Sequence, residues 1–318
     1  MILFFSVYIL SFHLVMGSDD WFLVWLGLEI NMMMFVMVIY KRYSMFNIES
    51  CFKYFFIQSL GSVIIMSVFY FNEEFHDVVL CLVLSYKIGA GPFYYWFPSL
   101  CSGISWMSCF VLMFLQKIIP LTLFSVFISW IIYMIIMVNL IMGVFGSFNQ
   151  KDLKQLIAYS SVYHLGWILL CMYTNGMMWV NYLLIYMVLV FPVIYFMKYK
   201  DMTSLMDMMM IENSKWMIIL MLSMAGMPPF LGFFLKWFVF VKVMTISVFM
   251  MLLLIISSVI MFYVYFRVLY DMLLSYFDMN SWGNLLMNKN NENSIKWLDC
   301  MSVMGILLGV IVSLMLLY

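Results

Sequence analysis

Long apolar runs separated by short polar connections make up most of the chain. A helix needs ~20 mostly apolar residues to cross a bilayer. Eleven runs approach or exceed that length, near residues 1–17, 20–40, 51–71, 78–98, 104–122, 126–147, 156–173, 178–198, 215–241, 245–270 and 296–317. The run from Ile104 to Phe148 is too long for one helix, so we expect it to reverse near Thr122–Ser129. The pattern predicts an all-α, polytopic membrane protein with about eleven transmembrane helices.

The polar stretches are too short to fold by themselves. The longest, at 280–294, is expected to be a connecting loop within a polar segment over 271–295. The N-terminal run has no basic leader and no obvious small-residue cleavage site, so it is interpreted as the first span rather than a removed signal. We therefore expect a single transmembrane domain over residues 1–318, ending in a helix over 296–318.

Positive charges lie on one side of this predicted topology. Connections are numbered here by the span that precedes them. The even-numbered connections and adjoining span ends hold eleven cations: Lys41, Arg42, Lys53, Lys151, Lys154, Lys198, Lys200, Lys215, Arg267, Lys289 and Lys296. The odd-numbered connections hold only Lys242, together with Asp19, Asp20, Glu73, Glu74 and Asp77. The positive-inside rule then places the N-terminus on the side equivalent to the mitochondrial matrix and Tyr318 on the opposite side.

Composition supports the same class of protein. The chain is 67% hydrophobic and 9% charged, with a mean hydropathy of +1.08. A soluble chain of 318 residues could not cover that much apolar surface with polar side chains. A formal net charge of zero gives no indication of a nucleic-acid partner. The six cysteines are scattered without a C-x-x-C pair or a His/Cys cluster, so we expect apolar filling rather than a metal site or disulfides. The scarcity of Ala and Arg is typical of an AT-rich genome, as in animal mitochondria.

Four charged residues lie deep inside predicted spans: Glu29, Lys87, Lys117 and Lys236. A charge at the membrane centre costs ~2.5–3.5 kcal/mol on insertion scales, so such residues usually face a bundle interior and mark an ion or proton path. The alternative is a structural role in fixed ion pairs. One glutamate cannot neutralise three lysines, and an ammonium removed from water releases its proton more readily. We therefore favour proton transfer, and we add His164, which follows Ser160 and Ser161 on one helical face.

Two of these lysines lie beside helix-breaking residues. Pro92 lacks a backbone N–H, so the fourth span is expected to break around Gly89, Gly91 and Pro92. Lys87 would then sit at the negative dipole end of the first half-helix. Aromatic residues of the segment 93–96 are expected to pack around the break and control water access.

The ninth span carries a second predicted break. It falls at Gly226, Pro228 and Pro229, shortly before Lys236, and shares the spacing G-x-x-P-F with the first. Because spans four and nine are five apart, they run in opposite directions. Residues 1–122 and 126–270 are therefore predicted to form inverted five-helix repeats, each with a broken fourth helix, which is the plan of many secondary transporters.

Around these residues the sequence resembles the antiporter-like membrane subunits of mitochondrial NADH:ubiquinone oxidoreductase, respiratory complex I. The similar stretches cover most of residues 20–240 and are "WLGLEIN" (25–31), "KIGAGPFYYWFP" (87–98), "SWMSCFVLMFLQKIIPL" (105–121), "GSFNQKDLKQLIAYSSVYHLGW" (146–167) and "AGMPPFLGFFLKW" (225–237). The family commonly has histidine after the first Pro-Phe, where this chain has Tyr94, so no proton role is carried over there. After about residue 275 the resemblance fades.

The resemblance implies a function for the chain. Glu29, Lys87, Lys117 and Lys236 fall on the family's proton-translocation positions, and His164 falls on a family histidine. It implies a location in the inner mitochondrial membrane and partners among other membrane-arm subunits, including other antiporter-like ones, with protons and internal water moving through the chain. No cofactor is expected in this chain, because "GAG" (89–91) lies in a transmembrane break rather than after a strand. Two alternatives stay open: a stand-alone cation/proton antiporter and a non-pumping structural subunit.

Overall fold

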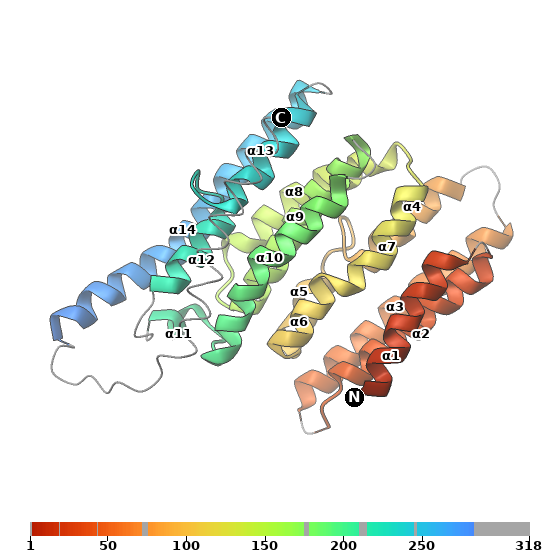
Figure 1. The fold of residues 1–318 in the computed structure, drawn as a ribbon, viewed down its shortest axis with the longest axis horizontal. Coiled ribbons are helices and arrows are strands. Elements are labelled where there is room, and N and C mark those ends of the chain that lie inside the picture. Colours follow the sequence, from red (N-terminus) through yellow and green to blue (C-terminus); the bar gives the residue numbers. More distant parts are fainter. Residues whose placement is uncertain are drawn as a thin grey trace. The chain divides into compact units, whose positions relative to one another are not determined.

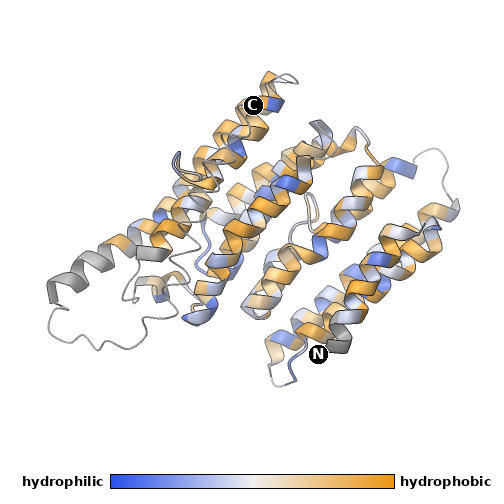
Figure 2. Ribbon diagram, viewed as in Figure 1, coloured by the Kyte–Doolittle hydropathy of each residue, from blue (hydrophilic) through white to orange (hydrophobic). Residues whose placement is uncertain are grey.

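The computed structural model describes residues 2–18, 20–42, 44–71, 76–174, 178–209, 215–244 and 247–282. Every element of regular structure in these ranges is an α-helix (Figure 1). Apolar residues cover most of the length of these helices (Figure 2). The chain divides into two compact units, Met1–Gly143 with Lys154–Gly176, and Val144–Leu153 with Met177–Tyr318.

The first unit contains most of the helices that carry predicted site residues. They are α1 (Ile2–Gly17), α2 (Trp21–Ile39), α3 (Met45–Phe71), α4 (His76–Ile88), α5 (Trp96–Gly103), α6 (Trp106–Met113), α7 (Leu115–Val126), most of α8 (Ile131–Phe148) and nearly all of α9 (Leu153–Thr174). Helix α3 packs against α2, α4 and α5, and α4 packs against α7. Helix α3 therefore neighbours α2, which carries Glu29, α4, which carries Lys87, and α5, which follows the first predicted break.

The second unit contains the other broken segment. Its helices are α10 (Met178–Tyr199), α11 (Leu205–Met209), α12 (Lys215–Ala225), α13 (Leu231–Val243) and α14 (Val248–Trp282). Helix α12 packs against α10, α13 and α14.

Seven helical segments in the described part of the chain are long and apolar enough to cross a membrane. They are Trp21–Ile39, Met45–Tyr70, Trp106–Val126, Ile131–Phe148, Leu153–Thr174, Met178–Tyr199 and Val248–Tyr270, and Ser6–Gly17 is a shorter apolar helix. The predicted all-α, membrane-type architecture is thus confirmed at this level. The eleventh predicted span at 296–317 and the polar segment from 283 onward lie outside the described residues.

Several boundaries differ from those predicted. Helix α3 begins at Met45 rather than near residue 51, because Glu49 and Lys53 form an i,i+4 ion pair of 2.6 Å on its first turns. Helix α14 continues to Trp282 instead of ending near 270, since the sequence there holds no Gly or Pro. The reversal after the fifth span falls at 127–130, between α7 and α8, next to the predicted position.

Glycine allows two pairs of helices to approach closely. A Cβ placed on Gly143 of α8 would lie 2.7 Å from the Cα of Tyr163 in α9. A Cβ on Gly27 of α2 would lie 3.3 Å from the carbonyl oxygen of Ser11 in α1. Small residues at such crossings are the usual means by which helices associate in lipid. The contact at Tyr163 also fixes the part of α9 that carries His164.

Candidate functional site

The fourth predicted span is interrupted between α4 and α5. Helix α4 ends at Ile88, Gly89 has a φ of 72°, the Gly91–Pro92 peptide bond is cis, and α5 begins at Trp96. The N–H of Gly91 donates to Oδ1 of Asn139 in α8 at 2.6 Å. A polar group freed from a helix inside a membrane needs a protein partner. The Asn139 side chain supplies that partner for the backbone at the interruption.

Lys87 lies in the last turn of α4 and its side chain crosses the surface of α3. It is 5% exposed. A Cβ on Gly61 of α3 would lie 2.9 Å from the Cγ of Lys87 and 3.0 Å from its Cε, so only glycine leaves room for this side chain. One turn earlier on α3, Nε2 of Gln58 donates to the carbonyl oxygen of Lys87 at 2.9 Å. Helix α3 therefore holds both the backbone and the side chain of Lys87.

Lys117 is equally buried, at 4% exposed, and lies on α7. Its Nζ donates to Oγ of Ser161 in α9 at 3.3 Å and lies 4.4 Å from the ring centroid of Phe97 in α5. The helical run 106–126 is interrupted at Phe114, so that α7 begins only two residues before Lys117. Neither the Ser161 contact nor the Phe97 contact neutralises the lysine, since a hydroxyl and an aromatic ring carry no net charge.

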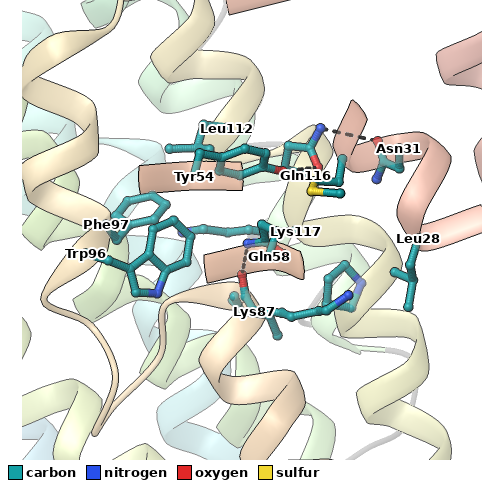
Figure 3. A pocket seen from close by; sticks show the side chains of 13 residues that line it. Leu28, Asn31, Tyr54, Gln58, Lys87, Trp96, Phe97, Leu112, Gln116 and Lys117 are labelled. Atoms are coloured by element: carbon teal, nitrogen blue, oxygen red, sulfur yellow. Dashed lines mark hydrogen bonds between the residues drawn. The ribbon is translucent and has the colours of Figure 1, made fainter. Parts of the chain in front are cut away.

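A small polar cavity joins Lys87 and Lys117 (Figure 3). Its volume is about 20 Å³, which is room for one water molecule. Tyr54 donates to Oε1 of Gln116 at 3.1 Å, and Nε2 of Gln116 donates to Oδ1 of Asn31 at 3.2 Å. The remaining walls come from Leu28, Met32, Gln58, Ile88, Trp96, Phe97, Leu112 and Pro120. The arrangement gives the two lysines a shared, hydrogen-bonding space inside the apolar bundle.

Glu29 lies on α2, half-buried, and is held from α3. The hydroxyl of Ser62 donates to its carboxylate, and the carboxylate interacts electrostatically with Lys87. The hydrogen bond to Glu29 thus comes from Ser62, while Asn31 bonds Gln116 instead.

His164 lies on α9 at 4% exposed, with its ring 5.3 Å from that of Tyr163. Ser161, one turn earlier on the same helix, is the residue that accepts from Lys117. Of the polar stripe expected on this helix, Ser161 contacts Lys117 directly. Glu29, Lys87, Lys117 and His164 all belong to the first unit.

The second unit repeats the relation between a helix end and a lysine. Helix α12 ends at Ala225, Gly226 has a φ of 85°, and α13 begins at Leu231 after Pro228 and Pro229. The Nζ of Lys236 donates to the carbonyl oxygen of Ala225 at 3.0 Å, and the side chain is 6% exposed. The ammonium thus meets the C-terminal, partially negative end of α12. Lys236 also borders an apolar cavity of about 480 Å³ between α13 and α14.

The aromatic residues after the first break divide between the interior and the surface. Trp96 donates from Nε1 to the carbonyl of Tyr86 at 3.1 Å, and Phe93 packs edge-on against the Tyr86 ring. Tyr94 is buried and its hydroxyl lies 3.7 Å from Sδ of Met142, whereas Tyr95 is exposed. Tyr94 and, in part, Trp96 therefore pack into the interior at the break, whereas Phe93 and Tyr95 are exposed.

In the part of the chain that the structure describes, no cluster of three or more His, Cys, Asp or Glu side chains is suitably placed for a metal ion. Five cysteines there are free and buried, and Cys300 lies outside the described residues.

Several polar residues of this site were not singled out from the sequence. Gln58 and Ser62 stand four apart on α3, and Gln116 immediately precedes Lys117, so polar side chains inside apolar spans were the available signal. Asn139 is fully buried in α8 and carried the same signal. Which partner each would find depends on how the helices pack, and periodicity alone does not give that.

A bundle of apolar helices that carries buried lysines at helix interruptions defines a polytopic membrane protein of the ion-translocating type. The sequence matches the family described as "NADH:quinone oxidoreductase/Mrp antiporter, TM" over residues 18–72 and 66–261. The chain belongs to this family.

Named relatives and solved structures agree with that assignment. NADH-ubiquinone oxidoreductase chain 2 of Anopheles gambiae is 31% identical over 87% of this chain and 86% of its own length. The protein of the same name from Aedes aegypti is 32% identical over 99% of this chain and 98% of its own length. A chain of respiratory complex I from Thermus thermophilus superposes with a TM-score of 0.79 at 19% identity, covering 96% of this chain and 77% of that one. A chain of the Mrp complex from Dietzia superposes with a TM-score of 0.67 at 14% sequence identity, covering 85% of this chain and 58% of that one.

Proposed function

We propose that this chain is an antiporter-like subunit of the membrane arm of respiratory complex I and transfers protons across the inner mitochondrial membrane. The redox energy comes from electron transfer between NADH and ubiquinone in neighbouring subunits, and no cofactor is assigned to this chain. The near full-length similarity to proteins named NADH-ubiquinone oxidoreductase chain 2 supports the assignment to the complex. The lysine site supports the proton-transfer role.

One observation carries the proton-transfer role. Lys87 and Lys117 line the same water-sized cavity, and Glu29 interacts electrostatically with Lys87. Both ammonium groups are removed from bulk water, and one carboxylate cannot neutralise both, so each charge is costly to hold and responds to a neighbouring charge. Side chains whose charge changes at low cost are what a proton path requires.

The proposed mechanism is charge coupling along the first unit. A change of protonation at Glu29 alters the field at Lys87, which then passes a proton through the cavity toward Lys117. His164 shares α9 with the Ser161 contact of Lys117 and continues the path. Lys236 of α13, which donates to the last carbonyl of α12, is the corresponding group of the second unit.

The finer architecture belongs to the same proposal. We assign eleven transmembrane helices, with 1–122 and 126–270 as inverted five-helix repeats and 296–318 as a final helix. The interruptions at 89–95 and 226–230 are the broken fourth helices of the two repeats. The charge asymmetry of the connections supports an N-terminus on the matrix side and a C-terminus on the intermembrane-space side.

Replacing Lys87 with methionine tests the role directly. The Lys87→Met side chain keeps the apolar stem over Gly61 but cannot carry a proton, so we expect the assembled enzyme to lose at least half of its protons translocated per NADH oxidised. Proton uptake by reconstituted vesicles and NADH oxidation are measured together. Full pumping stoichiometry in this variant would support a purely structural subunit. The exposed Lys53→Met substitution on α3 serves as the matched control.

A further inference from the structure

One face of α3 contacts two of the predicted proton carriers of the first unit, Glu29 and Lys87, and reaches a third, Lys117, through its neighbour Gln116. Tyr54, Gln58, Gly61 and Ser62 recur at spacings of four, three and one, which places them on a single helical face. Tyr54 bonds the amide beside Lys117, Gln58 and Gly61 hold Lys87, and Ser62 bonds Glu29. We call these four residues the α3 stripe. The stripe is the common support of Glu29, Lys87 and the residue beside Lys117.

Within the α3 stripe, Ser62 has a hydrogen-bonding feature that the other members lack. Its hydroxyl has a single proton but two acceptors in reach, the Glu29 carboxylate on α2 and the carbonyl oxygen of Ser59 on its own helix at 2.8 Å. The side chain is 1% exposed, so water is poorly placed to substitute for either partner. A hydroxyl can both donate and accept, and its proton rotates to suit its surroundings.

We propose that Ser62 is a positioning residue for proton transfer, because its hydroxyl stabilises both protonation states of Glu29 by turning between these two acceptors. When Glu29 is charged, Ser62 donates to the carboxylate. When Glu29 is protonated, the carboxylic acid donates to Oγ of Ser62 and the serine proton turns to the Ser59 carbonyl. Glu29 gains one proton and Ser62 exchanges none, so the step balances with the proton that the path supplies. This role rests on the proposed function of Glu29.

The consequence is that Glu29 changes charge without losing its hydrogen-bond partner. A buried carboxylate left without a donor, or a buried acid left without an acceptor, is destabilised, and either would trap one protonation state. With the rotating hydroxyl, both states keep one hydrogen bond and no backbone movement is needed. The neighbouring stripe residue Gly61 leaves room for the Lys87 side chain, so Glu29 and Lys87 are contacted from adjacent positions of α3.

The test compares three variants in the assembled complex reconstituted in phospholipid vesicles. Ser62→Ala removes the hydroxyl, and we expect coupled proton translocation to slow about tenfold, as for loss of one charge-assisted hydrogen bond. Ser62→Thr keeps a hydroxyl and is expected to restore most of the rate. Ser67→Ala is the matched control. Ser67 lies on the same helix, is exposed, and donates its hydroxyl to the Ile64 carbonyl of its own helix.

A spectroscopic signature separates positioning from a loss of structure. The infrared carboxylic-acid band of Glu29, identified as the band that Glu29→Gln removes, is expected to shift in Ser62→Ala and to stay in place in Ser67→Ala. Wild-type translocation in Ser62→Ala, an unshifted band, or a Ser62→Thr variant as slow as Ser62→Ala would each overturn the proposal. If Glu29→Gln itself pumps normally, the proposed function of Glu29 fails first.

Discussion

At the scale of single residues, neutral hydrogen-bonding and aromatic groups hold the charged side chains of the site in place. Lys117 meets a hydroxyl and an aromatic ring, Lys236 meets a helix-end carbonyl, and Glu29 meets a hydroxyl. A cation over an aromatic face gains ~0.5–2 kcal/mol, which is less than the ~2.5–3.5 kcal/mol cost of the charge at membrane depth. These contacts therefore hold the side chains in position but leave their charge easy to change.

Gly61 provides a residue-scale prediction. Gly61→Ala raises intrinsic helix propensity by ~1 kcal/mol, so α3 itself is not weakened. Its new Cβ would nevertheless lie 2.9 Å from Cγ of Lys87 and displace that side chain. We expect normal assembly with slower proton translocation, measured by proton uptake and by the amount of intact complex on native gels.

Gly17 is the matched control for this substitution. It ends α1, and a Cβ placed on it has no atom within 4 Å, so Gly17→Ala is expected to leave translocation unchanged. Equal rates in the Gly61 and Gly17 variants would contradict the steric role assigned to the α3 stripe.

At the scale of elements, helix interruptions were the most predictable part of the site. Gly and Pro together mark both interrupted segments in the sequence, and α4 and α12 end directly before Gly89 and Gly226, which have positive φ. Proline alone is not a sufficient signal, because Pro120 lies inside α7 and Pro192 inside α10. The interruption at Phe114 could not be predicted in this way, since its neighbours Met113 and Leu115 are ordinary helix formers. The contact of Ser62 with Glu29 could not be predicted from the sequence either, because it depends on how α2 and α3 pack.

Helix α11 supports a prediction about pH. Hydrogen bonds from the backbone N–H groups of Ser204 and Thr203 lower the pKa of Asp207 to about 2, in a capping box completed by the Ser204 hydroxyl. The lowered pKa means that this stabilisation is fully present above the unfolded value of ~3.9 and is lost as the pH falls through about 2. Asp207→Asn leaves a neutral, weaker acceptor and so removes the charge-dependent part of this stabilisation at every pH, and we expect faster amide hydrogen exchange at Thr203 and Ser204 at neutral pH.

The control for this experiment is Asp201→Asn. Asp201 is an exposed aspartate with a φ of 49°, a conformation that asparagine tolerates well. Exchange at Thr203 and Ser204 should match the wild type in this variant. If the two substitutions accelerate exchange equally, the capping box does not hold α11.

At the scale of the whole molecule, the fold alone does not separate an enzyme subunit from a free carrier. Chains of complex I and of an Mrp complex both superpose on this one at low identity. Hydropathy and charge gave the all-helical membrane class from the sequence, whereas the partners followed from resemblance rather than from any pattern of residues. The distinction between the two functions therefore depends on what the chain assembles with.

Purification gives the corresponding prediction. Extracted in mild detergent, the chain should copurify with flavin, iron–sulfur proteins and NADH oxidation, because the proposed function takes its energy from redox subunits. Reconstituted alone, it should not exchange sodium for protons across liposomes. Sodium/proton exchange by the isolated chain, without copurifying NADH oxidation, would favour the stand-alone antiporter.

The contact between Phe97 and Lys117 links the helix interruption to a proposed proton carrier. Phe97 belongs to α5, which follows the interrupted segment, while Lys117 belongs to α7. Any displacement of α5 changes how well the ring solvates the ammonium, and by thermodynamic reciprocity the arrival or departure of that proton biases the position of α5 by the same free energy. A movement of residues 89–95 and a change of charge on Lys117 of α7 are therefore thermodynamically coupled.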